Sequence, residues 1–232
     1  MLDASTRRAL DDPIAASLAV RHARFARGDG HAQRYDPQIS PLGAASGATA
    51  VHVRALEALY DVGETLVTAG PHVPTLSDDW EVQHASAVTQ MVRDGDAPLP
   101  EGDLEPIVLT ASDADDMLAL VALTLPGPFK RRTIELGRFI GLRQKGRLVA
   151  MAGERMWIGT CREVSGVCTH PDARGRGYAK ALMGRVVNRM ISAGETPFLH
   201  VESGNAQAID VYRALGFVKR AEFPLLYARR LR

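Results

Sequence analysis

The chain has 232 residues, of which 46% are hydrophobic and 24% are charged, and its net charge is +1. These values are typical of a folded globular protein and exclude a disordered chain, a collagen-like chain and a coiled-coil rod. No apolar run reaches the roughly 18 residues that a membrane helix needs, and the start lacks the pattern of a secretory signal. With only two cysteines, Cys161 and Cys168, we expect reduced thiols in a cytoplasmic protein rather than a disulfide scaffold.

The charges are divided unevenly along the chain. Residues 1–104 hold 8 Lys and Arg against 15 Asp and Glu, whereas residues 105–232 hold 20 against 12. A basic half indicates an anionic ligand, and nucleic acid, a membrane surface and a phosphate-bearing cofactor all meet that condition. The net charge changes from negative to positive around segment 94–106. This segment is acidic and rich in Pro and Gly, which predicts a linker or surface loop. We therefore expect two regions, 1–104 and 105–232.

The first region has a weak pattern. Residues 50–60 favour a helix, 64–69 favour a strand, and 81–92 carry apolar residues without a clear period. We expect a small mixed α/β unit of unknown role, either a degenerate second copy of the second region's fold or an extension.

The second region has clearer elements, and Ser112 is expected to cap its first helix. Its best helix is 178–192, where six apolar side chains form one continuous stripe. In chain order, strands are expected at 106–110, 139–143, 147–157, 163–169, 198–202, 217–223 and 225–230, and helices at 112–125, 130–136, 178–192 and 206–215.

A glycine-rich turn, Arg174-Gly-Arg-Gly-Tyr-Ala179, joins a strand to the best helix. Glycines let the backbone N–H groups curl inward, and the free N–H groups of the helix start face the same place. With two arginines beside them, these groups predict a pyrophosphate site. The P-loop and the dinucleotide fingerprint fit less well, because Tyr178 stands where the first needs Lys, and Lys180 where the second needs Gly or Ala. The alternative is a plain glycine turn with solvated arginines.

These residues resemble the signature of the GNAT superfamily of acyl-CoA-dependent N-acyltransferases. The signature is Arg or Gln, two residues, Gly, one residue, then Gly or Ala, and Arg174, Gly177 and Ala179 match it. A later segment of the family is also matched, by Asn205, Ala208, Tyr212 and Gly216-Phe217. The resemblance covers roughly residues 105–232, and the His170-Pro-Asp sequence before the turn is most similar to the glycine N-acyltransferase-like branch.

The resemblance implies a mixed, mostly antiparallel sheet flanked by helices, with acetyl-CoA as co-substrate. It implies that the fourth strand of the family fold splays from the fifth and that the pantetheine arm inserts between them. Gly166 then marks either the bulge that opens this gap or simple close packing. The implied cofactor-binding residues are Val167, Cys168 and Thr169 through their backbone, Asn205 through its amide, and Arg174, Gly175, Arg176, Gly177, Tyr178 and Ala179 around the pyrophosphate.

The resemblance also implies direct transfer of the acyl group to an amine. A free amine is mostly protonated near pH 7, so a base must remove a proton. Glu163 resembles the family's common position for that base, and Glu154 is the rival. Tyr212 is expected to protonate the leaving thiolate, and Cys168 to be a buried packing residue rather than a nucleophile.

We expect the acceptor to be a primary amine of a small molecule, an amino acid or a peptide, and we expect no metal, nucleic acid or membrane as a partner. A longer acyl-CoA donor and a non-catalytic acyl-CoA-binding module are the alternatives. The basic half lacks interleaved aromatic residues, which disfavours nucleic acid. The oligomeric state is not encoded in any motif, and a homodimer is one possibility.

Overall fold

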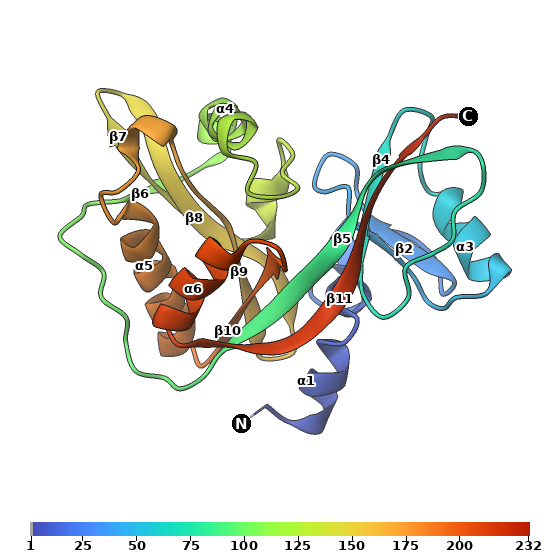
Figure 1. Cartoon of the computed structure of the whole chain (residues 1–232), viewed down its shortest axis with the longest axis horizontal. Helices are drawn as coiled ribbons and strands as arrows, with labels where there is room; N and C mark the ends of the chain where they lie inside the picture. The colour runs from blue at the N-terminus through green and yellow to red at the C-terminus, as the bar shows by residue number, and fades with distance from the viewer. Residues whose placement is uncertain (1) are drawn as a thin grey trace.

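The computed structural model describes residues 2–232. It contains an eight-stranded sheet in the order β4-β11-β5-β10-β9-β8-β7-β6 and a small three-stranded sheet, β1-β2-β3 (Figure 1). The strands are β1 (Ala26–Gly28), β2 (Ala32–Tyr35), β3 (Gly43–Ala45), β4 (Thr65–Ala69), β5 (Trp80–Arg93), β6 (Ile107–Leu109), β7 (Phe139–Gln144), β8 (Arg147–Ile158), β9 (Cys161–Thr169), β10 (Thr196–Glu202) and β11 (Phe217–Arg230). The α-helices are α1 (Ala4–Ala9), α2 (Pro13–Ala19), α3 (Ala50–Glu57), α4 (Ala114–Thr124), α5 (Tyr178–Ser192) and α6 (Ala206–Ala214). The expected fold class, a mixed and mostly antiparallel sheet flanked by helices with a smaller α/β region before it, is confirmed.

The large sheet is built from both regions of the chain. Strand β5 pairs antiparallel with β10 on one side and with β11 on the other, so it is a central strand. Figure 1 shows β5 and β11 as two long strands that run side by side from the lower middle of the view, near β10, to the upper right, near β4. The expected boundary at residue 104 lies in the segment without helix or strand, but it does not separate two sheets.

The weak pattern of β5 has a structural cause. Residues 81–85 are exposed on both faces of the strand, whereas residues 88–92 are buried on both faces. Neither half shows the alternation of a strand with one buried face, and alternation is the signal that sequence analysis depends on.

Strand β11 is continuous, whereas the sequence predicts two strands separated at Pro224. Its register against β5 shifts twice, between Lys219 and Ala221 and between Tyr227 and Ala228. Strand β4 pairs only with residues 225–229, so Pro224 lies just beyond that pairing, where a strand tolerates proline.

Two expected details near α4 are wrong. The helix is preceded by a 3-10 turn at 111–113, and Thr110 rather than Ser112 forms its capping box with Asp113. The expected helix at 130–136 is only a 3-10 turn at 133–136.

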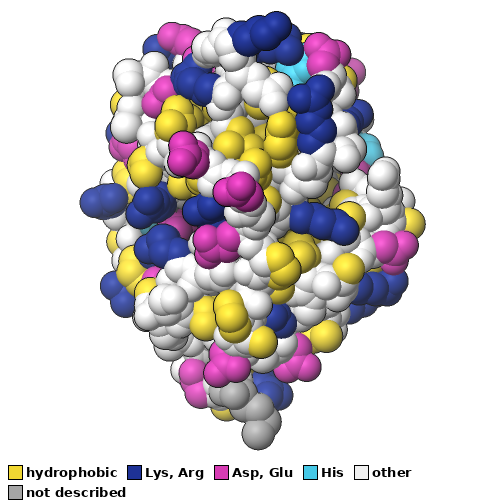
Figure 2. Space-filling model, turned by 90° about the vertical axis from the view of Figure 1, so that its left-hand side faces the viewer, with side chains coloured by type: hydrophobic (Ala, Val, Ile, Leu, Met, Phe, Trp, Pro, Cys, Tyr) yellow, Lys and Arg dark blue, Asp and Glu magenta, His cyan; other side chains and the backbone are white. Residues whose placement is uncertain are grey.

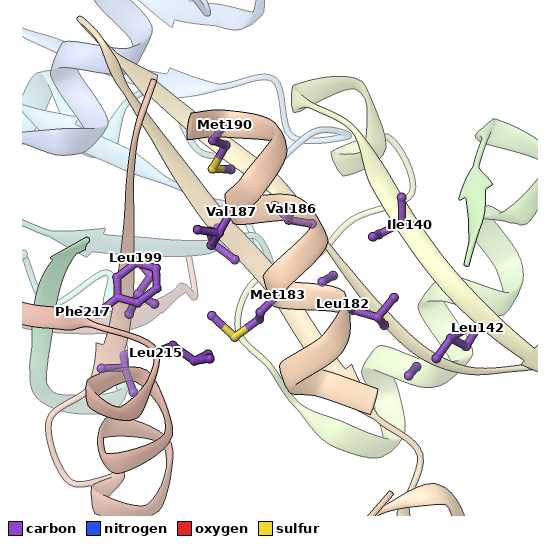
Figure 3. Close-up of a cluster of buried hydrophobic side chains, with 14 of the residues drawn as sticks. Ile140, Leu142, Leu182, Met183, Val186, Val187, Met190, Leu199, Leu215 and Phe217 are labelled. Atoms are coloured by element: carbon purple, nitrogen blue, oxygen red, sulfur yellow. The ribbon is translucent and has the colours of Figure 1, made fainter. Parts of the chain in front are cut away.

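Helix α5 has the bounds expected from its apolar stripe, and it anchors one face of the sheet (Figure 3). Its buried side chains, with those of β7, β10, β11 and the end of α6, form one core cluster, labelled in Figure 3 as Ile140, Leu142, Leu182, Met183, Val186, Val187, Met190, Leu199, Leu215 and Phe217. The segment 94–106 packs on this helix, because the Asn188 amide accepts from the N–H and donates to the carbonyl of Leu99 at 2.7 and 2.9 Å.

The opposite face of the sheet is covered by the first region. Phe198 of β10 packs with Ile14 and Leu18 of α2, whereas its neighbour Leu199 packs with α5. Successive side chains of a strand point to opposite faces, so α2 and α5 lie on different sides of β10.

Strands β9 and β10 separate near their middle. They are parallel, and their pairing extends only from Thr196 with Cys161 to Phe198 with Glu163. The register of β9 against β8 shifts at Gly166, whose φ is 63°. This β-bulge, one of the two alternatives for Gly166, accompanies the opening, and the other alternative, close packing, also holds, because a Cβ at Gly166 would lie only 3.0 Å from Phe139.

Candidate active site

One cavity of about 530 Å³ lies at the opening between β9 and β10. Its lining includes Ala179 and Met183 of α5 on one side of the sheet and Ile14 of α2 and Val67 of β4 on the other. The cavity is also lined by residues 167–169 of β9 and 200–202 of β10, which lie beyond the point where these two strands pair with each other. The cavity therefore connects the two faces of the sheet.

The glycine-rich turn lies at the α5 end of this cavity, and Arg174 and Ala179 line it. Gly175 and Gly177 both have φ of 76°, a conformation that other residues adopt at a cost, and a Cβ at either would meet no atom within 4 Å. Gly177 is the N-cap of α5, and among residues 2–232 no side chain caps that helix. The N–H groups of its first turn are therefore available to an anion.

The arginines of the turn are exposed, and Tyr178 is held from the side: its hydroxyl accepts from the Gln144 amide at 2.6 Å. On the face drawn in Figure 2, Lys and Arg side chains are mixed with acidic and hydrophobic ones. The positive charge of the second region is thus not gathered into one uniform basic surface on that face.

The splayed part of β9 supplies the wall beside the opening. Val167, Cys168 and Thr169 all line the cavity. Burial raises the pKa of the Cys168 thiol to about 11, so it stays neutral near pH 7. This environment suits the expected packing role of Cys168 and disfavours a nucleophile.

Helix α6 brings Asn205 and Tyr212 to the same cavity. The Asn205 side-chain oxygen accepts from the Ala208 N–H at 3.1 Å, so Asn205 also caps the helix, which leaves its amide NH₂ for a ligand. The Tyr212 ring packs against Phe217 at 6.3 Å between centroids, and burial raises the pKa of its hydroxyl. A protonated phenol at the cavity wall fits an acid.

Glu163 is not placed as the sequence predicts for a base that faces the acceptor. Its side chain is fully buried, does not line the cavity, and accepts two hydrogen bonds from Arg155 at 2.7 and 2.8 Å and one from His200 at 2.8 Å. Burial alone would raise the pKa of this carboxyl, but Arg155 and His200 outweigh it and hold the pKa well below its usual range. Arg155 and His200 line the cavity in its place.

The rival carboxylate, Glu154, is also remote from the cavity. Its side chain is buried, and it pairs with Arg189 of α5 and lies 3.7 Å from Arg162. Neither of the two expected carboxylates therefore reaches the cavity.

A polar cluster that sequence analysis missed lies on the α2 side of the cavity. The Glu202 carboxylate accepts from His84 Nε2 at 2.5 Å and from the Ser86 hydroxyl at 2.8 Å. His84 and Glu202 are both about half exposed, and both line the cavity. The period-2 pattern places Phe198, His200 and Glu202 on one face of β10, but no sequence signal links them to β5.

Residues 2–232 also lack a membrane-spanning helix and a metal-binding cluster. No helix there is long and apolar enough to cross a membrane. No group of three or more His, Cys, Asp or Glu side chains in that range is arranged to hold a metal ion.

Comparison with known proteins identifies the family. The crystal structure of an acetyltransferase of the GNAT family from Novosphingobium aromaticivorans is similar to this chain, with a TM-score of 0.86. The two sequences are 33% identical, and the match covers 95% of this chain and 98% of the other. The chain belongs to the GNAT acetyltransferase family. The family sequence model described as "Acetyltransferase (GNAT) family" matches residues 113–217 of this GNAT protein. A GCN5-related N-acetyltransferase from Kribbella flavida, 18% identical over 99% of this chain and 96% of its own with a TM-score of 0.64, shares the fold. A comparison with curated proteins found no match.

Family membership makes this protein an acyl-CoA-dependent N-acetyltransferase. Enzymes of this family generally take acetyl-CoA as co-substrate and act on amine acceptors.

Proposed function

We propose that this GNAT enzyme transfers an acetyl group from acetyl-CoA directly to a primary amine of a small molecule, an amino acid or a peptide. The observation that carries the proposal is the cavity between β9 and β10, which opens toward α5 and α6 on one face of the sheet and toward α2 on the other. Two reactants that enter from opposite faces meet at the opening without an intermediate carried by the protein.

The α5 side is the proposed acetyl-CoA side. The pyrophosphate would lie on the N–H groups of residues 174–179, supported by Arg174 and Arg176. The pantetheine arm would follow the free backbone edge of Val167, Cys168 and Thr169, with the Asn205 amide beside it. A backbone N–H at the β9 bulge would stabilise the oxyanion that forms at the thioester.

Tyr212 is the proposed acid. It lines the cavity from α6, the helix that also carries Asn205, so it lies on the acetyl-CoA side of the opening. The raised pKa of its hydroxyl keeps the proton available for the departing thiolate.

The acyl chain length and the glycine N-acyltransferase-like branch stay predictions. The branch was suggested by the motif His170-Pro-Asp. In the structure, His170 Nδ1 accepts from the Asp172 N–H at 3.2 Å and caps the turn at 171–173. This local role accounts for the motif without an acceptor, so amino acids are one class to test rather than the favoured one.

The test is a screen for thiol release from acetyl-CoA, with butyryl-CoA in parallel, across alkylamines, amino acids and short peptides. We expect turnover with acetyl-CoA and at least one primary amine, and binding of acetyl-CoA by calorimetry. Binding without turnover across the whole panel would favour a regulatory module, and faster turnover with butyryl-CoA would favour a longer donor.

The cellular setting also stays a prediction. Both cysteines are buried and free, which is compatible with the reducing conditions of cytoplasm. Sizing of the purified protein by light scattering distinguishes a monomer from a homodimer.

A further inference from the structure

The carboxylate that receives the acceptor's proton is a separate question, because the two glutamates expected from the sequence are both buried in ion pairs. Each is already compensated by arginine, so a proton transferred to Glu163 would leave Arg155 buried without its partner, and one transferred to Glu154 would break its pair with Arg189. A base that meets the acceptor must instead lie at the cavity wall with an oxygen free to accept.

Glu202 meets both conditions. It lies at the end of β10 and lines the cavity, and its side chain is 48% exposed. Its Oε1 accepts from both His84 and Ser86, whereas its Oε2 has no hydrogen-bond partner among residues 2–232. The carboxylate is thus oriented through one oxygen and open through the other.

Its position relative to Tyr212 suits the chemistry. Glu202 shares the α2 face of β10 with Phe198, whereas Tyr212 lies on α6 at the other face. A base on one side of the opening and an acid on the other suit an amine that attacks the thioester carbonyl carbon from one side while the sulfur departs on the other.

The rest of the α2-side wall is mostly apolar. Its members come from α2, β4, β5, β8, β11 and the loop after β2, and they are Pro13, Ile14, Leu42, Val67, Ala69, Val88, Met156 and Leu225. Arg155 also lines this wall, but its bidentate pair with Glu163 already compensates its charge. The wall therefore favours an apolar body on the acceptor and does not require an anionic one.

We propose that the acceptor is a primary amine on an apolar body, that Glu202 binds its ammonium group and removes a proton, and that His84 is a positioning residue for Glu202. This proposal rests on the proposed acetyltransferase function and names the acceptor class and the base.

The protons balance as follows. An ammonium N–H bond breaks and its proton passes to Glu202 Oε2 and then to solvent. The neutral amine forms a C–N bond at the thioester carbon. As the C–S bond breaks, the sulfur takes a proton from Tyr212, and the second proton lost by the nitrogen restores Tyr212 through water. The products are the acetamide and coenzyme A, with one proton released.

The charged and titratable groups that face Glu202 decide how its activity depends on pH. They are His84 from β5, His200 from β10, Arg155 from β8 and Tyr227 from β11. Hydrogen bonds from His84 and Ser86 hold the pKa of Glu202 below its usual value, so the carboxylate is ionised across the working range.

Glu202→Gln tests the base. We expect kcat to fall about 10²-fold at pH 7 and the deficit to shrink as pH rises, because free amine becomes plentiful. Hexylamine binding to the protein without acetyl-CoA should weaken at least tenfold by calorimetry, while acetyl-CoA affinity stays within threefold. The matched control is Glu222→Gln. Glu222 is similarly exposed and is bonded to Thr89 on the other face of β5, so its substitution should change neither kcat nor hexylamine binding.

His84 is tested by rescue. His84→Gln keeps a donor toward Glu202 and should retain the rate within about threefold and the wild-type pH profile, whereas His84→Ala should lower kcat. An unchanged His84→Ala rate would remove the positioning role.

A homologous series, or ladder, of alkylamines of increasing length, from ethylamine to hexylamine, tests the acceptor class. Each buried methylene should raise kcat/KM about fourfold. A flat or falling ladder would overturn the apolar acceptor, and a wild-type rate and pH profile in Glu202→Gln would overturn the base, while the acetyltransferase function would stand in both cases. Failure to bind acetyl-CoA, or no thiol release with any amine, would overturn the proposed function and this inference together.

Discussion

At the scale of single residues, identical side chains take different roles because their surroundings differ. Glu154, Glu163 and Glu202 lie on three neighbouring strands of the large sheet, β8, β9 and β10. The first two are buried among arginines, and only Glu202 lines the cavity. The partner of each carboxylate, rather than its residue type, therefore decides what it can do.

Gly177→Glu tests the pyrophosphate site. The left-handed backbone at Gly177 adds roughly 1–2 kcal/mol of strain to any other residue, and a carboxylate there would repel the pyrophosphate. We expect a folded protein without measurable acetyl-CoA binding by calorimetry. Gly194→Glu is the control, because Gly194 has φ of 73° and open space around it but lies at the far end of α5. Equal affinity in the two variants would place the cofactor elsewhere.

Tyr212→Phe tests the acid. The substitution keeps the ring that packs on Phe217 and removes only the hydroxyl. We expect kcat to fall by about 10²-fold, within the range of general acid catalysis, with acetyl-CoA affinity nearly unchanged. Steady-state kinetics combined with calorimetry measure both quantities. Full activity would leave Tyr212 as a packing residue.

At the scale of elements, one buried ion-pair network ties three strands together below the cavity. Glu163 of β9 bonds to Arg155 of β8 and His200 of β10, and it also accepts from the Met156 N–H at 3.2 Å. The network holds β10 beside β9 at the point where the two strands begin to separate. It is thus suited to fixing the width of the opening.

Glu163→Gln should destabilise the protein by about 3–5 kcal/mol at pH 7, because it leaves Arg155 buried without its full partner. The pKa of Glu163 is lower in the folded state than in the unfolded chain, so its stabilisation is present above the unfolded value of about 4.3 and is lost as pH falls below it. Urea denaturation at pH 7 and pH 3.5 should therefore show that the free energy of unfolding falls less on acidification in the variant than in the wild type. Glu135→Gln, at an exposed pair with Arg132, should cost under about 1 kcal/mol.

At the scale of the whole molecule, the first region is part of the enzyme's framework. Strand β5 lies between β10 and β11, and α2 covers the face of the sheet at which the acceptor wall lies. The acidic and basic regions of the chain therefore share one sheet and one cavity, despite the change in charge between them.

This arrangement predicts that the two regions unfold together. Removing β5 would separate β10 from β11 and leave β11 without a neighbouring strand in the second region, so the eight-stranded sheet needs both regions. We expect circular dichroism and tryptophan fluorescence to give coincident urea transitions, with Trp80 reporting on the first region and Trp157 on the second. Two separated transitions would show that the regions are independent domains.

The sequence by itself determined the features that local rules specify. The bounds of α5 follow from its apolar period, and the glycine-rich turn follows from backbone freedom at Gly175 and Gly177. These features were sufficient to indicate the family, because the turn and the helix that follows it are adjacent in the chain.

Only the tertiary structure decided which carboxylate reaches the acceptor and what the first region contributes. Glu202 and His84 are 118 residues apart, and they meet because β5 inserts beside β10. Glu163 lies in a strand that leads to the opening, but Arg155 and His200 close around it once the sheet forms. Strand pairing and burial are long-range properties, so no period or spacing in the sequence records them.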